Sequence, residues 1–154
     1  GRRQRGRPTW PVAAAGPATN FLLAGVGAVV LGLMAAAGMV APEPGQAPGL
    51  LATGVFAFIG MNVFLGMFNL LPIPPFDGSH IVEGLLPDAA ARVYSRMRPF
   101  GLALMFGLLL VIPWLLDVLG LPPLGIIERL VLPLTDGVQA LYLGLAQWIA
   151  DSLG

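Results

Sequence analysis

The fold of this 154-residue chain is decided by the stretch Asn69-Leu70-Leu71-Pro72-Ile73-Pro74-Pro75-Phe76-Asp77-Gly78, where a long apolar run meets a carboxylate. No charged residue lies between Glu43 and Asp77. Ionisable side chains in membrane segments are costly unless they are compensated, and they commonly mark functional sites. The three prolines cannot sustain a regular helix, and a break at membrane depth survives only where protein or a water-filled cavity satisfies the backbone. The stretch therefore predicts a functional site around Asp77.

The composition is that of a membrane protein. Hydrophobic residues make up 56% of the chain and charged residues 10%, whereas a soluble domain carries about 25% charged residues. The absence of cysteine excludes disulfides and thiolate metal sites. All eight basic residues are arginines that flank apolar runs without forming a basic face, which argues against nucleic-acid binding. The predicted fold class is an all-α membrane protein.

Hydropathy predicts about three transmembrane helices, because about 20 apolar residues cross the hydrocarbon core. The first two predicted spans are Val12–Val40 and Leu50–Leu71, and a loop rich in proline and glycine, Ala41–Gly49, separates them. The third predicted span is Pro99–Leu116. Pro113 is expected to kink or end this third span.

Two short helices are predicted between the proline-rich break and the third span. One runs from Gly78 to Leu86, and Gly78 is expected to let the backbone turn directly after Asp77. The other runs from Ala89 to Met97, with Asp88 as its predicted N-cap.

The chain is predicted to divide into a membrane core, residues 1–120, and a helical tail, residues 121–154. The tail is apolar but interrupted by prolines and charged residues. We expect its helices to lie in the membrane interface or to pack against the bundle. A fourth span over Leu134–Ala150 is the alternative, because its length is close to that needed for a crossing.

The arginines predict the orientation of the chain in the membrane. One cluster, within residues 1–7, precedes the first span, and the other, within residues 92–98, lies between the second and third spans. Two crossings separate the clusters, so both fall on one side, which the positive-inside rule makes cytoplasmic. The loop Ala41–Gly49 then faces outward. The clusters consist of Arg2, Arg3, Arg5, Arg7, Arg92, Arg96 and Arg98.

The side chains of Asn69 and Asp77 are the first candidates for chemistry. Carboxylate oxygen is an accepted zinc ligand, and catalytic zinc keeps three protein ligands and one open position. An asparagine amide can donate to a developing oxyanion or hold the backbone of a substrate. Caps at the end of one helix and the start of the next explain the same two residues equally well.

Residues 69–78 resemble the NxxPxPxxDG signature of site-2 proteases, which are intramembrane zinc metalloproteases. The stretch Gly16-Pro17-Ala18-Thr19-Asn20 is similar to the GPxxN element of the same family. The GPxxN element alone is weakly specific, but the two motifs occur in the order of the family, on successive spans. The resemblance covers roughly residues 10–110.

The resemblance implies a metal, a reaction and partners. The zinc of the family is held by two histidines of an HExxH helix and by one aspartate, whose position Asp77 matches. The HExxH glutamate acts as general base on the zinc-bound water. Asn20 and Asn69 would line the site and bind the substrate backbone. The implied substrates are transmembrane segments of other proteins, cleaved in the lipid bilayer.

The sequence departs from the family because it contains no HExxH, and His80 is its one histidine. One histidine and Asp77 cannot complete a three-ligand zinc site. We expect that the N-terminal half of the protein is missing from this sequence, since both motifs are intact, and that the fragment alone is inactive. His80 as a ligand is a weaker alternative, because the family does not use this position as a ligand. Glu83 as a base is equally weak, because HExxH should provide the base, and Glu83 would instead pair with His80 or an arginine.

Two rival functions come from other classes. One is a non-catalytic pseudoprotease or membrane scaffold that binds transmembrane helices, and an upstream HExxH would distinguish the enzyme from it. The other is a transporter fragment with a broken helix at its site. A transporter would need paired broken helices, and this sequence predicts one.

Overall fold

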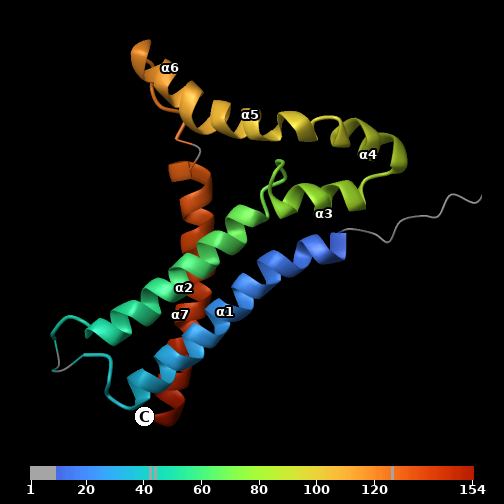
Figure 1. The fold of residues 1–154 in the computed structure, drawn as a ribbon. Helices are drawn as coiled ribbons and strands as arrows, with labels where there is room; N and C mark the ends of the chain where they lie inside the picture. Colours follow the sequence, from blue (N-terminus) through green and yellow to red (C-terminus); the bar gives the residue numbers. More distant parts are fainter. Residues whose placement is uncertain (1–9, 42, 44, 126) are drawn as a thin grey trace, which may run out of the picture. The chain divides into compact units, whose positions relative to one another are not determined.

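The computed structural model describes residues 10–41, 43, 45–125 and 127–154, and it is predominantly helical (Figure 1). No strand occurs in these described ranges, which confirms the predicted all-α class. The elements are α1 (Trp10–Ala36), α2 (Leu50–Asn69), α3 (Asp77–Leu85), α4 (Asp88–Ser95), η1 (Arg98–Phe100), α5 (Gly101–Phe106), η2 (Gly107–Val111), α6 (Ile112–Val118), η3 (Ile127–Val131) and α7 (Leu132–Leu153).

Among the residues that the structure describes, three helical stretches are long and apolar enough to cross a membrane, as the hydropathy predicts. They are α1, α2 and the run Asp88–Val118, which comprises α4 to α6. The third run begins before the predicted Pro99 because α4 and the turn after it lead directly into η1 and α5. The arginines of residues 1–7 lie outside the described residues.

The chain forms two compact units. The first unit consists of residues 1–17 and 68–125, and the second of residues 18–67 and 126–154, each as far as the structure describes it. The first unit contains the proline-rich break, and the second contains α2 up to Met67 together with α7. The predicted division between residues 1–120 and 121–154 stays a prediction.

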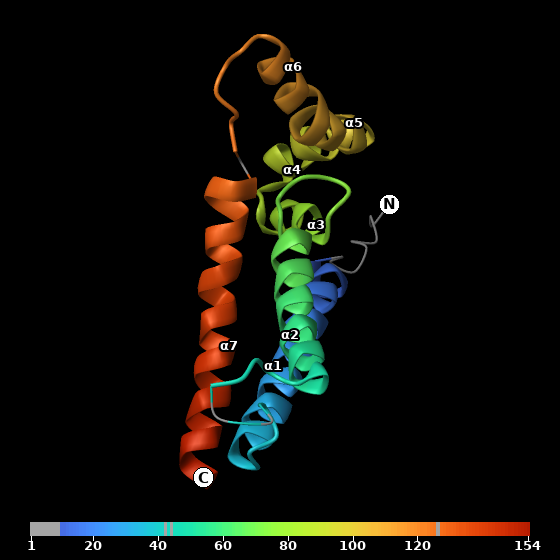
Figure 2. The ribbon, with the colours of Figure 1, turned by 90° about the vertical axis from the view of Figure 1, so that its left-hand side faces the viewer.

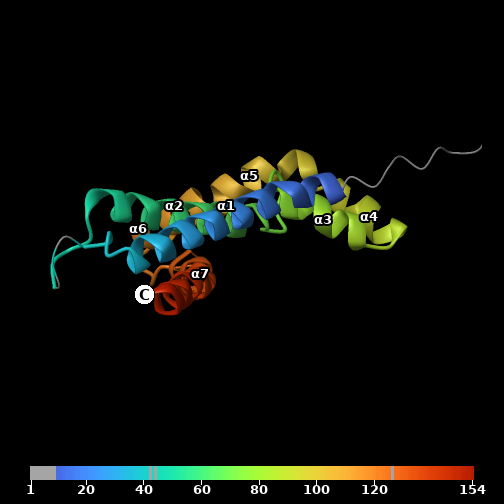
Figure 3. The ribbon, with the colours of Figure 1, turned by 90° about the horizontal axis from the view of Figure 1, so that it is seen from below.

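The second unit has a core of small and branched side chains. Ala24 and Ala28 of α1, Ile59 and Val63 of α2, and Ala146 of α7 form one buried cluster. Small residues let helices approach closely where hydrophobic burial against lipid gives little driving force. Figure 2 shows α7 beside α1 and α2, and Figure 3 shows α7 nearly end-on, so it crosses the other two helices at an angle. The tail therefore packs on the bundle, and its assignment as interfacial or as a fourth span stays a prediction.

Two further contacts fix α7 on α1. A side chain at Gly32 would place its Cβ 2.7 Å from the carbonyl oxygen of Ala146, so the two helices are in backbone contact there. The hydroxyl of Tyr142 donates a hydrogen bond of 2.9 Å to the carbonyl oxygen of Phe21. Close packing and one polar contact together set the register of α7.

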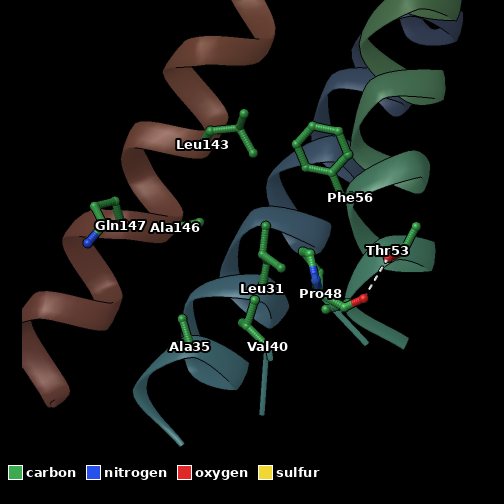
Figure 4. Close-up of a pocket in the computed structure, with 10 residues that line it drawn as sticks. Leu31, Ala35, Val40, Pro48, Thr53, Phe56, Leu143, Ala146 and Gln147 are labelled. Atoms are coloured by element: carbon green, nitrogen blue, oxygen red, sulfur yellow. Dashed lines mark hydrogen bonds between the residues drawn. The ribbon is translucent and has the colours of Figure 1, made fainter. Parts of the chain in front are cut away.

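The second unit also contains an apolar hollow of about 510 Å³ (Figure 4). Thr53 and Gln147 are the polar side chains among its lining residues, and the Thr53 hydroxyl donates to the carbonyl oxygen of Pro48 at 3.4 Å. The hollow therefore offers no group of convergent polar atoms for chemistry. Its lining residues are Leu31, Ala35, Val40, Pro48, Ala52, Thr53, Phe56, Leu143, Ala146 and Gln147.

Glycine ends α1 earlier than the predicted Val40. Gly38 has a φ of +68°, and its N–H donates to the carbonyl oxygen of Ala35, while the N–H of Met39 donates to Met34. This pair of bonds is the Schellman arrangement, which satisfies the last carbonyls of a helix and favours glycine. Gly120, with a φ of +64°, ends α6 in the same way.

Pro113 and Pro133 each follow a π-helical segment of five residues. Val111, the last residue of η2, lies two residues before Pro113, and η3 ends two residues before Pro133. The N–H of Ile112 donates to the carbonyl oxygen of Gly107, five residues earlier. The helical run continues to Val118, so Pro113 is tolerated inside the third span and does not end it.

The prediction that Asp88 caps α4 is wrong. The N-cap is Pro87, no side chain caps this helix, and Asp88 is its first helical residue. A carboxylate in the first turn still interacts favourably with the helix dipole, which explains an acidic residue at this position.

Candidate functional site

The proline-rich break lies between the last residue of α2, Asn69, and the first residue of α3, Asp77, within the first unit (Figure 1). The three prolines supply no N–H, and the peptide bond between Pro74 and Pro75 is cis. The rings of Phe68 and Phe76 meet edge to face with centroids 4.6 Å apart, which joins the two ends of the break. We call Leu70–Phe76 the proline loop.

Gly78 allows α3 to pack against the proline loop. A Cβ at Gly78 would overlap the carbonyl groups of Leu70 and Leu71. Its φ is not in the left-handed region, so the prediction that Gly78 provides a turn is wrong. The glycine is needed because backbone meets backbone at this point.

Asp77 stands in the first turn of α3 without acting as its cap. The N-cap is Phe76, and no side-chain hydrogen bond caps the helix. The side chain of Asp77 is half-buried. Its carboxylate has no hydrogen bond or ion pair with any residue that the structure describes. The capping explanation of this carboxylate therefore has no support in the structure.

The two sequence motifs meet at this carboxylate. A Cβ at Gly16 would lie 2.5 Å from the Oδ2 atom of Asp77, well inside ordinary contact distance. Gly16 and Asp77 belong to the same unit, although 60 residues separate them in the sequence. The missing side chain at Gly16 thus leaves the space that the carboxylate occupies.

The carboxylate opens onto a hollow of about 480 Å³ in the first unit. Asp77, His80 and Glu83 are spaced three residues apart on α3, so they lie along one face of the helix. Val12, Ala13 and Arg98 complete the lining. The polar edge of α3 and the start of α1 therefore share one cavity.

Arg98 links the other two polar side chains of this cavity. Its guanidinium forms an ion pair with the Glu83 carboxylate, and its Nη2 atom donates to Nδ1 of His80 at 3.3 Å. The Nδ1 atom therefore acts as an acceptor, which requires it to carry no proton. Because Glu83 pairs with an arginine, it is compensated and is not a free base.

The donor set of the described residues fits zinc in part. No group of three histidine, cysteine, aspartate or glutamate side chains gathers in the described part of the chain. Asp77 nevertheless offers a half-buried carboxylate without a protein partner among the described residues, in a space that Gly16 leaves open. Carboxylate oxygen is a regular zinc ligand. The chemistry of Asp77 thus fits one zinc ligand, and the described residues do not gather a complete three-donor set around it.

The two asparagines lie in different units. Asn69 is half-buried at the end of α2 in the first unit, and it is not among the residues that line the hollow. Asn20 is half-buried on α1 in the second unit. Their roles at the site stay predictions.

Two residues that hold the proline loop had no signal in the sequence. The hydroxyl of Tyr94, in α4, donates to the carbonyl oxygen of Pro72, and the buried Gly101, at the start of α5, lies against Pro74. Both contacts join positions more than 20 residues apart, and neither residue belongs to a motif. Local sequence patterns do not report contacts of this kind.

Comparison with known proteins identifies the family. The sequence model of peptidase family M50 matches residues 35–112, which is just over half of the chain. "Putative zinc metalloprotease YwhC" of Bacillus subtilis is 36% identical over 106 residues, which cover 66% of this chain and 45% of that protein. "Putative zinc metalloprotease MJ0611" of Methanocaldococcus jannaschii is 40% identical over 72 residues, which cover 47% of this chain and 32% of that protein.

The matched region spans less than half of the length of either relative. No solved structure matches the chain. The family model includes the motif around Asp77, and it confirms the resemblance to site-2 proteases that this motif carries. The chain is thus a membrane protein that belongs to peptidase family M50.

Proposed function

We propose that the protein to which this chain belongs is an intramembrane zinc metalloprotease, which hydrolyses peptide bonds in or near transmembrane segments of other proteins. Membership of a peptidase family and three helices fit to cross a membrane support this proposal. The observation that carries it is the contact between Gly16 and the Asp77 carboxylate, which brings the two family motifs together. A carboxylate that has no hydrogen-bond or ion-pair partner among the described residues is suited to a cation.

In this proposal Asp77 is one of three zinc ligands. The other two are imidazoles from the part of the relatives that this sequence does not match, because His80 is the one histidine here. When bound, zinc lowers the pKa of a coordinated water towards about 7 and polarises the scissile carbonyl. The general base is likewise assigned to that unmatched part, since Glu83 is paired with Arg98.

In the proposal, two glycines of this chain position the ligand and two asparagines bind the substrate. Gly16 provides the space in which the carboxylate sits, and Gly78 fixes the first turn of α3 against the proline loop. We assign Asn69 and Asn20 to hydrogen bonds with an unwound substrate backbone, since an amide can both donate and accept. The lipid bilayer is the medium, and the arginines at residues 1–7 and 92–98 face the cytoplasm.

A non-catalytic scaffold that binds transmembrane helices is the second candidate. It is favoured by one observation: the sequence has no HExxH, and the described residues hold no three-donor group. A scaffold would need neither zinc nor the carboxylate of Asp77, so a single pair of variants separates the two functions.

The test compares Asp77→Asn with Asp88→Asn in the intact protein. Both aspartates are the first residues of short helices, so both substitutions remove the same helix-dipole interaction. The zinc affinity of the purified protein and the cleavage of a single-span membrane substrate are measured. We expect Asp77→Asn to lower the zinc affinity by more than about 100-fold, beyond the usual effect of an outer-shell partner, and to abolish cleavage.

Asp88→Asn should leave both quantities unchanged. If the Asp77→Asn variant binds zinc and cleaves the substrate as the wild-type protein does, Asp77 is not a zinc ligand. If the wild-type protein binds membrane helices, does not bind zinc and does not cleave the helices, the scaffold function is established instead.

A further inference from the structure

We propose that the segment Tyr94–Gly101, which we call the clasp, positions Asp77 for metal binding. It does so by contacting the chain before and after Asp77. The proposal rests on the proposed function, because it assigns residues that act through the zinc ligand. Three contacts carry it, one from each of three clasp residues, all within the first unit.

The first contact holds the start of the proline loop. The hydroxyl of Tyr94 donates a hydrogen bond to the carbonyl oxygen of Pro72, 22 residues earlier. Proline has no N–H, so Pro72 and Pro74 cannot help to anchor the loop by donating hydrogen bonds of their own. The Tyr94 hydroxyl, which belongs to α4, thus provides a hydrogen bond that fixes the backbone of the loop.

The second contact holds α3 beyond the ligand. Arg98 pairs with Glu83 and donates to Nδ1 of His80 at 3.3 Å. These two residues lie three and six positions after Asp77 on the same face of the helix. A guanidinium that binds both can therefore fix the rotation of α3 about its axis, and with it the direction of the Asp77 side chain.

The third contact is a close approach of two backbones. A Cβ at Gly101 would lie 2.7 Å from the carbonyl carbon of Pro74 and would also overlap its carbonyl oxygen. Gly101 is buried at the first position of α5, where the chain has turned back through α4 to reach the loop (Figure 1). The start of α5 therefore rests directly on the proline loop.

The three contacts surround Asp77 without touching it. Two hold the loop that precedes the carboxylate, and one holds the helix that follows it. Around Asp77, the N–H of Phe76 donates to the carbonyl oxygen of Ile73 at 3.0 Å, and the N–H of Ser79 donates to the carbonyl oxygen of Phe76 at 3.1 Å. These local hydrogen bonds set the shape of the turn but do not fix its direction relative to α4 and α5. In the proposal, the contacts of the clasp fix that direction.

The clasp residues are tested in the intact protein by Tyr94→Phe, Arg98→Gln and Gly101→Ala. The controls are Arg96→Gln and Gly107→Ala. Arg96 is exposed and forms no ion pair with a described residue, and a Cβ at Gly107 meets nothing within 4 Å. Each control therefore repeats the chemical change of a clasp variant without its contact.

Three measurements are made on every variant: zinc affinity, kcat and KM for a membrane substrate, and amide hydrogen exchange of the metal-free protein at Phe76 and Ser79. Loss of an outer-shell partner commonly lowers metal affinity or activity by about 10- to 100-fold. We expect zinc affinity and kcat to fall by about tenfold in the clasp variants, with KM within about twofold, because the ligand and not the substrate is displaced. Exchange at both amides should rise.

Rescue separates positioning from mere folding. Arg98→Lys keeps a cation for Glu83 and should recover most of the zinc affinity. The exchanged pair, Glu83→Arg with Arg98→Glu, should recover more than either single substitution. If Gly101→Ala does not fold, Tyr94→Phe carries the test, since it removes a single oxygen atom.

Clasp variants with the zinc affinity, kcat and amide exchange of their controls would overturn the proposal. A failure of the proposed function is visible separately, because then Asp77→Asn itself leaves the zinc affinity unchanged. If Asp77→Asn abolishes zinc binding and the clasp variants do not weaken it, the clasp assignment is wrong and the protease assignment stands.

Discussion

The substitution Gly16→Ala tests the site most directly, because it adds one methyl group beside the proposed zinc ligand. A Cβ at Gly16 would lie 2.5 Å from Oδ2 of Asp77, whereas ordinary van der Waals contacts begin at about 3.4 Å. The oxygen must therefore retreat by about 1 Å. Its neighbour Gly78 is packed against the carbonyl groups of Leu70 and Leu71, so the backbone of α3 has little freedom to move with it.

The expected loss follows from the tolerance of metal sites. Zinc–oxygen bonds are about 2.0–2.2 Å long, and functional sites tolerate displacements of about 0.2 Å to 0.5 Å. A misplacement of about 1 Å can cost about 100-fold in rate, which corresponds to about 2.7 kcal/mol of transition-state stabilisation. We expect kcat/KM of Gly16→Ala to fall by about that factor, together with the zinc affinity.

The assay measures cleavage of a single-span membrane substrate by the intact protein in lipid bicelles, with zinc content determined on the same samples. Gly54→Ala is the matched control, because Gly54 also lies inside a helix and a Cβ there meets nothing within 4 Å. Alanine is favoured over glycine in a helix by up to about 1 kcal/mol, so neither variant should lose helical structure.

A Gly16→Ala protein that keeps wild-type kcat/KM and zinc content would refute the reasoning, because the carboxylate would then not be held where the structure shows it. A loss of activity with unchanged zinc content would also contradict it. Only the combined loss of both, with Gly54→Ala unaffected, agrees with a displaced ligand.

Three further predictions concern stability and orientation. Gly38→Ala should destabilise the protein by about 1–2 kcal/mol in detergent unfolding, since the φ of +68° strains any residue with a Cβ, whereas Gly54→Ala should not; equal stabilities would contradict the C-cap assignment. Tyr142→Phe should cost about 0.6 kcal/mol, the average for a hydrogen bond between membrane helices, and a stabilised variant would show that the bond to Phe21 contributes nothing. A periplasmic or extracellular reporter fused at Gly45 should be active, and cytoplasmic reporter activity there would reverse the predicted topology.

The helical architecture could be predicted from the sequence because apolar length and proline are local signals. The three candidate spans, the break between Asn69 and Asp77, and the short helices after it all follow from such patterns. Errors occurred where two local explanations compete. Asp88 is the first helical residue and not the cap, because Pro87, with a non-helical φ of −56° and ψ of 149°, takes the N-cap position.

The contacts of the site could not be predicted, because they depend on packing between distant segments. The motifs indicated that Gly16 and Asp77 matter, but only the structure shows that the space left by one holds the carboxylate of the other. Gly78 was predicted as a turn residue, since sequence cannot distinguish a glycine needed for a positive φ from one needed for close approach. Tyr94 and Gly101 lie outside every motif, so no pattern marked them.

The clasp lies in the N-terminal half of Asp88–Val118, the least enclosed of the three candidate spans among the described residues. Only 6% of the most apolar window of Asp88–Val118 is buried within the chain, against 28% for α1 and for α2. The tilt of a span responds to hydrocarbon thickness, most of all where few neighbouring helices hold it. Gly101 lies within this span, at the start of α5, and rests on the proline loop. We therefore expect a change in acyl-chain length to shift the loop and the Asp77 carboxylate that follows it. Zinc affinity measured in bilayers of different acyl-chain length is expected to vary accordingly.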